Sequence, residues 1–342
     1  FQSQMQNVGT LLDGDVQGKL QGMSKQLKQV SIDTGAATSD LTDGLYQVVS
    51  AFGESAESVK QLEIAAKAAK AGNATTTDSV NMLSAVTKGY GDTSAAALQK
   101  ASDLAFLTVK LGQTSFPELA SSMGQVVPLA ATMKVSQEEL FGAMATLTGV
   151  TGGTAEVTTQ LRATMQEFLS PSSQMEKALK KMGYTSGAAA LESEGLGGIL
   201  TKLKESVKGD EVAFANLFSS IESKNAVLAL TGAQADAFAE KTAAMGEAAG
   251  ATDRAFKIQT NSVSAMASKL KNAGSVMLTS LGEKALPYVQ DAMQGLIDRM
   301  PAITETLGGV IERAGPMFGV MASGISNCLL YTSPSPRDRS LS

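Results

Sequence analysis

The chain has 342 residues, of which 43% are hydrophobic, so it can bury at least one sizeable core. Its 28 Lys and Arg against 33 Asp and Glu leave a formal charge of −5, which argues against a nucleic-acid-binding surface. The sequence contains no His, which excludes histidine general bases, Ser–His triads and HExxH zinc sites from this chain. No uninterrupted apolar run reaches the roughly 18 residues of a transmembrane helix.

The apolar residues predict an all-α fold. Aromatic residues make up only 5% of the chain, so its hydrophobic content is mainly Ala, Leu, Val and Met. Ala, Leu and Met lose little rotamer freedom in a helix and therefore favour it. The 16 Met residues predict cores or contact faces that can repack, because the thioether side chain is flexible.

Residues 1–35 predict an N-terminal helical segment. The chain begins at Phe1 without an initiating Met, so we expect the segment to be truncated upstream. Residues 15–31 place one apolar stripe at spacings of 3 and 4, which is typical of an amphipathic helix. The stripe consists of Val16, Leu20, Met23, Leu27 and Val30.

Residues 36–232 predict a compact core of many helices. Asp40 or Thr38 is expected to cap a helix that ends at Gly53, and Phe116-Pro117-Glu118 looks like a helix start with Pro in the first turn. Further helices are expected at about 55–72, 76–89, 94–111, 174–182, 196–207, 211–219 and 223–230. Strand-like alternation never exceeds four or five residues, so no sheet is expected.

The middle of this core carries the clearest local signals. Ser136 and Glu139 have the spacing of a capping box at the start of an apolar helix. A turn follows at Gly149, Gly152 and Gly153, after which Thr154 is expected to cap a helix that stops before Pro171.

Residues 233–327 predict an extended, coiled-coil-like region. One apolar register comprises Val263, Met266, Leu270, Ala273 and Met277. A second places eleven positions at alternating spacings of 3 and 4, which is a heptad pattern: Leu286, Val289, Met293, Leu296, Met300, Ile303, Leu307, Val310, Ala314, Met317 and Met321. Pro287, Pro301 and Pro316 interrupt it, so kinked or broken helices are expected.

Residues 328–342 differ sharply from the rest. They hold the chain's single Cys and two of its eight Pro, and helical periodicity stops there. Residues 328–338 resemble the translation of a transposon-end sequencing adapter, which identifies this segment as non-native sequence. The alternative is a genuine Pro- and Ser-rich tail.

A set of motifs in residues 136–183 resembles the core region of tape measure proteins from long-tailed bacteriophages. The motifs are the helix that Ser136 caps, the Gly149–Gly153 turn, Thr159-Gln-Leu161-Arg162, Leu169-Ser-Pro171-Ser172 and the helix end Met182-Gly183. Further similarities are Leu217-Phe218, residues 225–232, 250–253, 269–274 and 282–287, so the resemblance covers roughly residues 30–300. Val150 replaces the family's usual Ile and Thr158 its usual Gly.

The resemblance implies a structural protein that serves as a molecular ruler for tail length and assembly and later takes part in genome ejection. It implies location in the lumen of the phage tail within the virion, and in the host cytoplasm during assembly. Expected partners are the tail tube protein, tail assembly chaperones, tail tip proteins and further copies of the chain. The resemblance implies only indirect contact with DNA, and contact with the host membrane at ejection.

Four features are open to two interpretations. Arg162 is either a tail-partner contact or half of an internal ion pair or helix-dipole interaction. Lys177, Lys180 and Lys181 form either a phosphate site or a solvated face, and the Gly149–Gly153 turn resembles a phosphate cradle but lacks the Gly-Lys-Ser/Thr that would follow. The Met-bearing seam is either a membrane face or a core or homomeric coiled-coil surface.

No residue is predicted to be catalytic, cofactor-binding or metal-ligating, and no cofactor is expected. The alternatives from other classes are a membrane-perforating tail component and a wall-degrading glycosidase that uses only carboxylates. No cleft-forming α+β pattern surrounds any Glu, so the sequence favours a protein that is not an enzyme.

Overall fold

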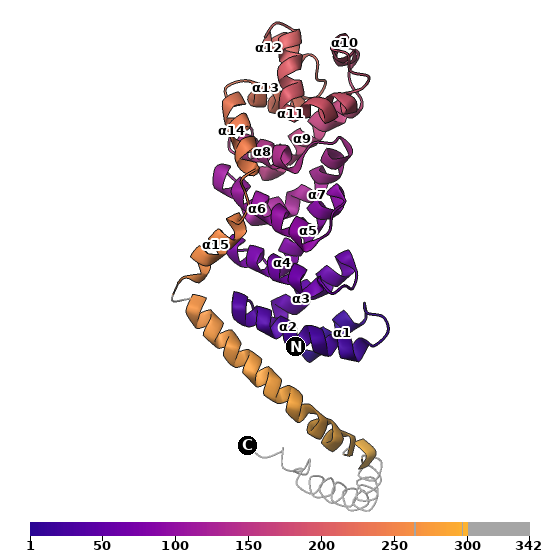
Figure 1. Ribbon diagram of the computed structural model, residues 1–342, viewed down its shortest axis with the longest axis vertical. Helices are drawn as coiled ribbons and strands as arrows, with labels where there is room; N and C mark the ends of the chain where they lie inside the picture. Colours follow the sequence, from indigo (N-terminus) through magenta and orange to yellow (C-terminus); the bar gives the residue numbers. More distant parts are fainter. Residues whose placement is uncertain (263–264, 296, 300–342) are drawn as a thin grey trace, which may run out of the picture. The chain divides into compact units, whose positions relative to one another are not determined.

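The computed structural model describes residues 1–262, 265–295 and 297–299 (Figure 1). It divides into two units, Phe1–Met277 and Leu278–Ser342. The predicted all-α class is confirmed, since the described residues form no strand and only one isolated bridge, between Thr148 and Gly152.

The first unit contains fifteen labelled helices, followed by helical residues 265–277. The helices are α1 (Gln2–Gly9), α2 (Val16–Thr34), α3 (Thr38–Phe52), α4 (Ser58–Gly72), α5 (Thr76–Tyr90), α6 (Ala95–Leu111), α7 (Phe116–Thr132), α8 (Gln137–Leu147), α9 (Thr154–Leu169), α10 (Ser173–Lys181), α11 (Gly187–Ser206), α12 (Glu211–Ala215), α13 (Ile221–Thr231), α14 (Ala235–Met245) and α15 (Ala251–Thr260).

The first unit is a stack of helices, most of which lie in two layers (Figure 1). In one layer α1, α3, α5, α7, α9 and α13 each pack against the next. In the other layer, called here the even layer, α2, α4, α6, α8 and α14 do the same. Such stacking lets each helix bury its apolar face mainly against its neighbours, as in helical repeat proteins.

Local signals place most of the helix ends. The predicted stripe of α2 is confirmed, because Leu20, Met23, Leu27 and Val30 are buried along it. The hydroxyl oxygens of Ser94 and Ser136 accept from the backbone amides of Ala97 and Glu139, which starts α6 and α8 at the expected places. The start of α7 at Phe116 is also confirmed, with a complete capping box between Ser115 and Glu118.

Two predicted caps are wrong, and the capping box predicted at Ser136 and Glu139 is only half formed. Helix α3 begins after Ala37, which has no capping side chain, and Asp40 turns to another helix. Helix α9 begins after Gly153 rather than at a Thr154 cap, and the Thr154 hydroxyl donates to Glu118. The Glu139 carboxylate does not complete a capping box but reaches Gly197, 58 residues away. In each case a tertiary partner competes successfully with the local one.

Helix α11 departs most clearly from its predicted bounds. Helix α11 starts nine residues earlier than the expected 196–207 segment, at Gly187, and bends at Gly195. Gly195 has a φ of 70°, which disfavours any residue with a side chain. The ideal Cβ position of Gly187 lies 2.1 Å from the carbonyl oxygen of Phe168, so only glycine lets α11 approach α9 this closely.

Aromatic side chains anchor the core at two places. Phe168 and Phe218 pack edge to face with ring centroids 6.2 Å apart, and Phe214 packs on Phe218 at 5.6 Å. These three rings join α9 to the segment around α12. Phe106 and Phe116 stack at 4.9 Å between α6 and α7.

The last part of the first unit runs back along the stack. Helix α14 packs on α8, and α15 packs on α6 and α4 (Figure 1). The side-chain amide of Asn272 donates to the carbonyl of Gly35, between α2 and α3. We call residues 235–277, apart from 263–264, the strap. The sequence predicts extension from residue 233; the structure instead folds the strap against the even layer. The predicted domain boundary at 232/233 stays a prediction.

In the second unit, residues 278–295 and 297–299 are helical. The helix continues through Pro287, so the expected break does not occur there. Pro301, Pro316, most of the eleven-position heptad seam and the 328–342 segment lie outside the described residues.

Candidate functional site

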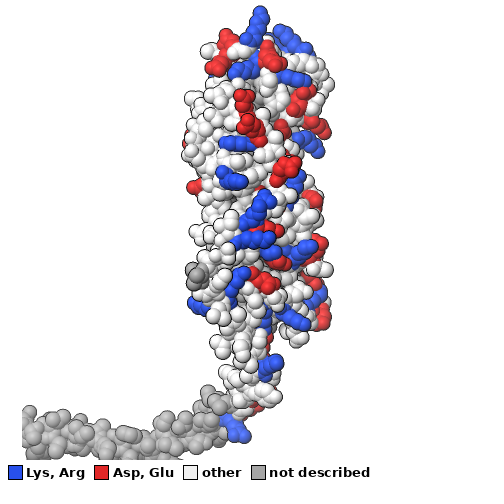
Figure 2. All heavy atoms as spheres, turned by 60° about the vertical axis from the view of Figure 1, so that its left-hand side comes forward, with Lys and Arg blue, Asp and Glu red and all other residues white. Residues whose placement is uncertain are grey.

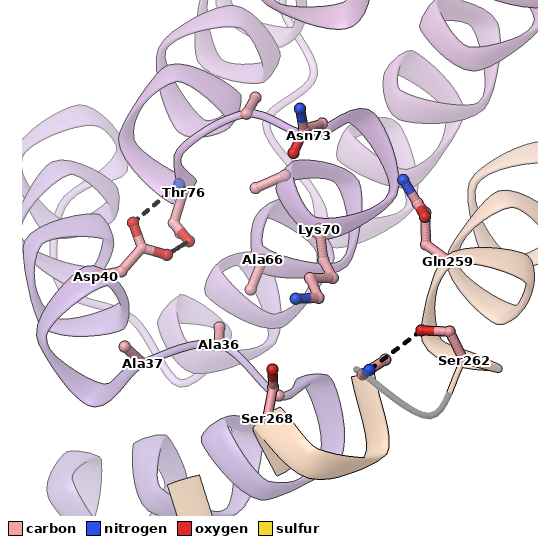
Figure 3. Close-up of a pocket in the computed structure, with 14 residues that line it drawn as sticks. Ala36, Ala37, Asp40, Ala66, Lys70, Asn73, Thr76, Gln259, Ser262 and Ser268 are labelled. Carbon is pink, nitrogen blue, oxygen red and sulfur yellow. Dashed lines mark hydrogen bonds between the residues drawn. The ribbon is translucent and has the colours of Figure 1, made fainter. Parts of the chain in front are cut away.

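A polar cavity of about 480 Å³ lies between the stack and the strap (Figure 3). Its lining comes from the start of α3, the end of α4, the start of α5 and the strap residues Gln259, Ser262, Ala265 and Ser268. The half-buried Lys70 extends into it and forms no ion pair with any described residue. Asp40 is already engaged at its edge, accepting from the hydroxyl of Thr76 and from its backbone amide at 3.2 Å.

A second cavity, of about 240 Å³, lies under α14. Phe238, Ala239 and Thr242 of the strap face Leu200, Thr201 and Leu230 across it. The buried Thr242 hydroxyl has no hydrogen-bond partner, and an unpaired buried polar atom costs stability. Both cavities therefore occur where the strap meets the stack, and neither gathers groups suited to catalysis.

The most buried carboxylates of the first unit cap helices distant in sequence. Asp103, 4% exposed, accepts from the backbone amides of Gly250 at 2.9 Å and Thr252 at 2.8 Å, at the start of α15. Glu167, 8% exposed, accepts from the amides of Ser219 at 2.6 Å and Ser220 at 2.8 Å, before α13.

Capping between helices recurs in the stack. Asp40 caps α5, Glu139 meets the second half of α11 at Gly197, and Glu57 accepts from Ala95 at 3.3 Å at the start of α6. A carboxylate at a helix N-terminus pairs with free amides and favourably meets the helix dipole. These acids are therefore structural, and sequence reasoning missed their partners, which lie 36 to 149 residues away.

The basic residues that the sequence singles out lie on the surface. Arg162 is exposed on α9 and forms no ion pair with a described residue, so the internal ion pair is not formed and a partner contact stays a prediction. Lys177, Lys180 and Lys181 are exposed near the end of α10, and Lys180 pairs with Glu176 at 2.6 Å. Their exposure supports the solvated-face interpretation. The hydrogen bond from Lys180 lowers the pKa of Glu176.

The glycine-rich turn is closed by backbone contacts. The amide of Gly149 donates to the carbonyl of Gly152 at 3.0 Å, and both residues have positive φ. The adjoining Thr154 hydroxyl contacts Thr114 at 2.7 Å and Glu118 at 3.0 Å, which ties the turn to α7. This geometry supports a structural turn rather than a phosphate cradle.

The Met-bearing register is exposed where the structure describes it. Met266, Leu270 and Met277 are 58%, 76% and 66% exposed, while Ala265 and Val276 form the buried face. In the second unit the seam residues Val289 and Met293 are 50% and 61% exposed, and Leu286 is half-buried. Exposed apolar side chains at heptad spacing are typical of a helix that pairs with another helix.

Charged patches, metal-ligand clusters and membrane-spanning helices would each indicate a function in the described part of the chain. On the face shown in Figure 2, acidic and basic side chains are interspersed. No described cluster of three or more His, Cys, Asp and Glu could hold a metal ion. No described helix combines the length and apolar character that a membrane span requires.

Comparison with known proteins places this helical stack in a family. Residues 24–221, more than half of the chain, match the family described as phage-related minor tail protein, and the chain belongs to that family.

One relative is the probable tape measure protein of Clostridium phage phiCD119, which is 24% identical over 340 residues. The match covers 95% of this chain but 36% of that protein, so the chain spans about a third of the relative's length. No solved structure matches the chain. The resemblance to phage tail tape measure proteins that the motifs around residues 136–183 carry is confirmed.

Proposed function

We propose that this chain is part of the molecular ruler that sets the length of a phage tail, and that it leaves the tail during genome ejection. The observation that carries the proposal is the similarity to a probable tape measure protein along nearly the whole chain. A stack of helix pairs agrees with such a role, because its dimensions grow with the number of residues. The proposed locations are the tail lumen and, during assembly, the host cytoplasm.

The proposed role is structural rather than catalytic. The buried carboxylates Asp103 and Glu167 are each bonded to two backbone amides, so neither is a free acid or base. The glycosidase alternative therefore finds no support in these residues. The membrane-perforating alternative has no specific observation in its favour.

The proposed partners are the tail tube protein, assembly chaperones, tail tip proteins and other copies of the chain. Self-association has the most direct support. The exposed register of Met266, Leu270 and Met277 offers a surface that a second helix of the same kind would bury.

The ruler is tested by deleting residues 76–111, the pair α5 and α6, from the gene of a phage that carries this protein. The tail should shorten by about 50 Å if the chain lies in the tail as continuous helix, at ~1.5 Å per residue. It should shorten by only about 10 Å if the helix pairs stay stacked at their interaxial spacing. Electron micrographs of tails measure both.

Two further variants complete the design. Duplication of residues 76–111 should lengthen the tail by the same amount. Replacement by an unrelated helical sequence of equal length should leave tail length unaltered, since a ruler reads length and not identity. Deletion and duplication that both leave tail length unchanged would refute the ruler.

A further inference from the structure

Hydrogen bonds attach the strap to the stack at α14, at the start of α15 and further along at Asn272. At α14, the ammonium of Lys241 donates to the carbonyl of Ala145 on α8 at 2.8 Å. At the start of α15, Asp103 accepts two backbone amides. Further along, the side-chain amide of Asn272 donates to the carbonyl of Gly35 at 2.8 Å.

The attachment by Asp103 is the most elaborate of the three. Asp103 accepts hydrogen bonds from two backbone amides. Beside it, the hydroxyls of Ser102 and Thr252 lie 2.7 Å apart in a buried contact. The donors Gly250 and Thr252 belong to one helix start, so losing the Asp103 carboxylate would leave both amides unpaired. This contact acts as a latch on α15.

Little apolar surface holds the strap otherwise. Only five of its described apolar side chains are buried, against six within the 17 residues of α7. They are Phe238, Met245, Ala248, Ala265 and Val276. Because burial of apolar area is the main source of cohesion, the strap is bound more weakly per residue than the helices it covers.

The contact is also imperfectly packed. The cavities of about 480 Å³ and 240 Å³ both have walls formed by the strap. The Thr242 hydroxyl is buried there without a partner, and Lys241 meets a carbonyl but no carboxylate among the described residues. Desolvation lowers the pKa of Lys241, which shows that the site disfavours its charge.

We propose that the strap is a releasable element that opens from the stack as one unit, with Asp103 as its latch. In the closed state it covers parts of α4, α6 and α8; once open, it frees those faces and lets its own residues continue away from the stack. Cavities and an unpaired hydroxyl lower the energy that opening must overcome. The inference goes beyond the ruler, since it concerns a property of the isolated chain.

Hydrogen exchange followed by mass spectrometry on the full chain tests the proposal. Amides of α14 and α15 should exchange at least tenfold faster than those of α5 and α7 under native conditions. In the variant Asp103→Ala, amide exchange in α14 and α15 should be a further tenfold or more faster, and exchange in α5 and α7 should not change. Glu167→Ala is the matched control: it removes an equally placed cap and should accelerate α13 instead.

A reversible cross-link gives an independent measurement. The ideal Cβ position of Gly142 on α8 lies 3.2 Å from Cβ of Thr242 on α14, slightly less than the usual span of a disulfide. Gly142→Cys with Thr242→Cys, in a Cys328→Ser background, should slow exchange in both α14 and α15 at least tenfold when oxidised, and reduction should restore it.

The outcomes separate cleanly. Equal exchange rates in the strap and in α5 and α7 would overturn the proposal. Faster amide exchange in every helix of Asp103→Ala would overturn it as well. Slowing of α14 without α15 in the oxidised chain would show that the strap does not move as one unit. None of these results bears on tail length, so the ruler stands or falls separately.

Discussion

Removing the Glu167 carboxylate should destabilise α13 and its surroundings by about 3 kcal/mol. Its two oxygens accept from the amides of Ser219 and Ser220 at 2.6 and 2.8 Å, and the side chain is 8% exposed. A hydrogen bond to a charged group contributes about 1.5–3 kcal/mol, and unpaired buried amides add a penalty of similar size. Relaxation and entering water offset part of this sum, which leaves the estimate of about 3 kcal/mol.

The measurement is hydrogen exchange in α13 of Glu167→Ala, compared with the wild-type chain. Since 1.4 kcal/mol corresponds to a factor of ten, protection there should fall about 100-fold. Glu167→Gln keeps one acceptor oxygen without the charge, so the protection of α13 in this variant should lie between those of the wild type and Glu167→Ala. A change below about 0.5 kcal/mol in Glu167→Ala would refute the reasoning, because it would mean that water or the backbone replaces both bonds without cost.

Two further predictions concern single aromatic residues. The hydroxyl of Tyr90 donates to the carbonyl of Val135 at 3.0 Å, and burial raises the pKa of this hydroxyl. Above a pH of about 10 the unfolded chain therefore loses this proton while the folded chain keeps it. Stability should fall there by as much as about 1.4 kcal/mol per pH unit from this group alone, and urea titrations should show a shallower alkaline loss in Tyr90→Phe; equal slopes would contradict it. Phe218→Ala should cost about 3–5 kcal/mol, because it empties a fully buried site that touches Phe168 and Phe214, and a loss in urea titration below 1 kcal/mol would show that the three rings are not a structural anchor.

Much of the secondary structure is predictable from short stretches of sequence. Ser94 and Ser136 cap helices where the pattern places them, and the stripe of Leu20, Met23 and Leu27 is buried as its spacing predicts. These signals work because a cap and an amphipathic face depend on residues only three or four positions apart.

The failures share one cause. Asp40, Glu139 and Thr154 have the residue type and spacing of local caps, yet their side chains bond Thr76, Gly197 and Glu118 on other helices. A local pattern cannot show that a neighbouring helix end will compete for the same carboxylate or hydroxyl. The heptad register of the strap was equally ambiguous, since its pattern does not reveal that the face with Ala265 and Val276 is the buried one.

The amino-acid sequence alone determined that this chain is helical, where most of its helices begin and end, and that its motifs resemble phage tail proteins. Each of these depends on neighbours along the chain or on motif order. Only the tertiary structure decided that the helix pairs stack in two layers, that Asp103 and Glu167 cap distant helices, and that the strap folds back on the even layer. Those features arise from contacts between residues as many as 237 positions apart, whose partners are set by packing and not by spacing.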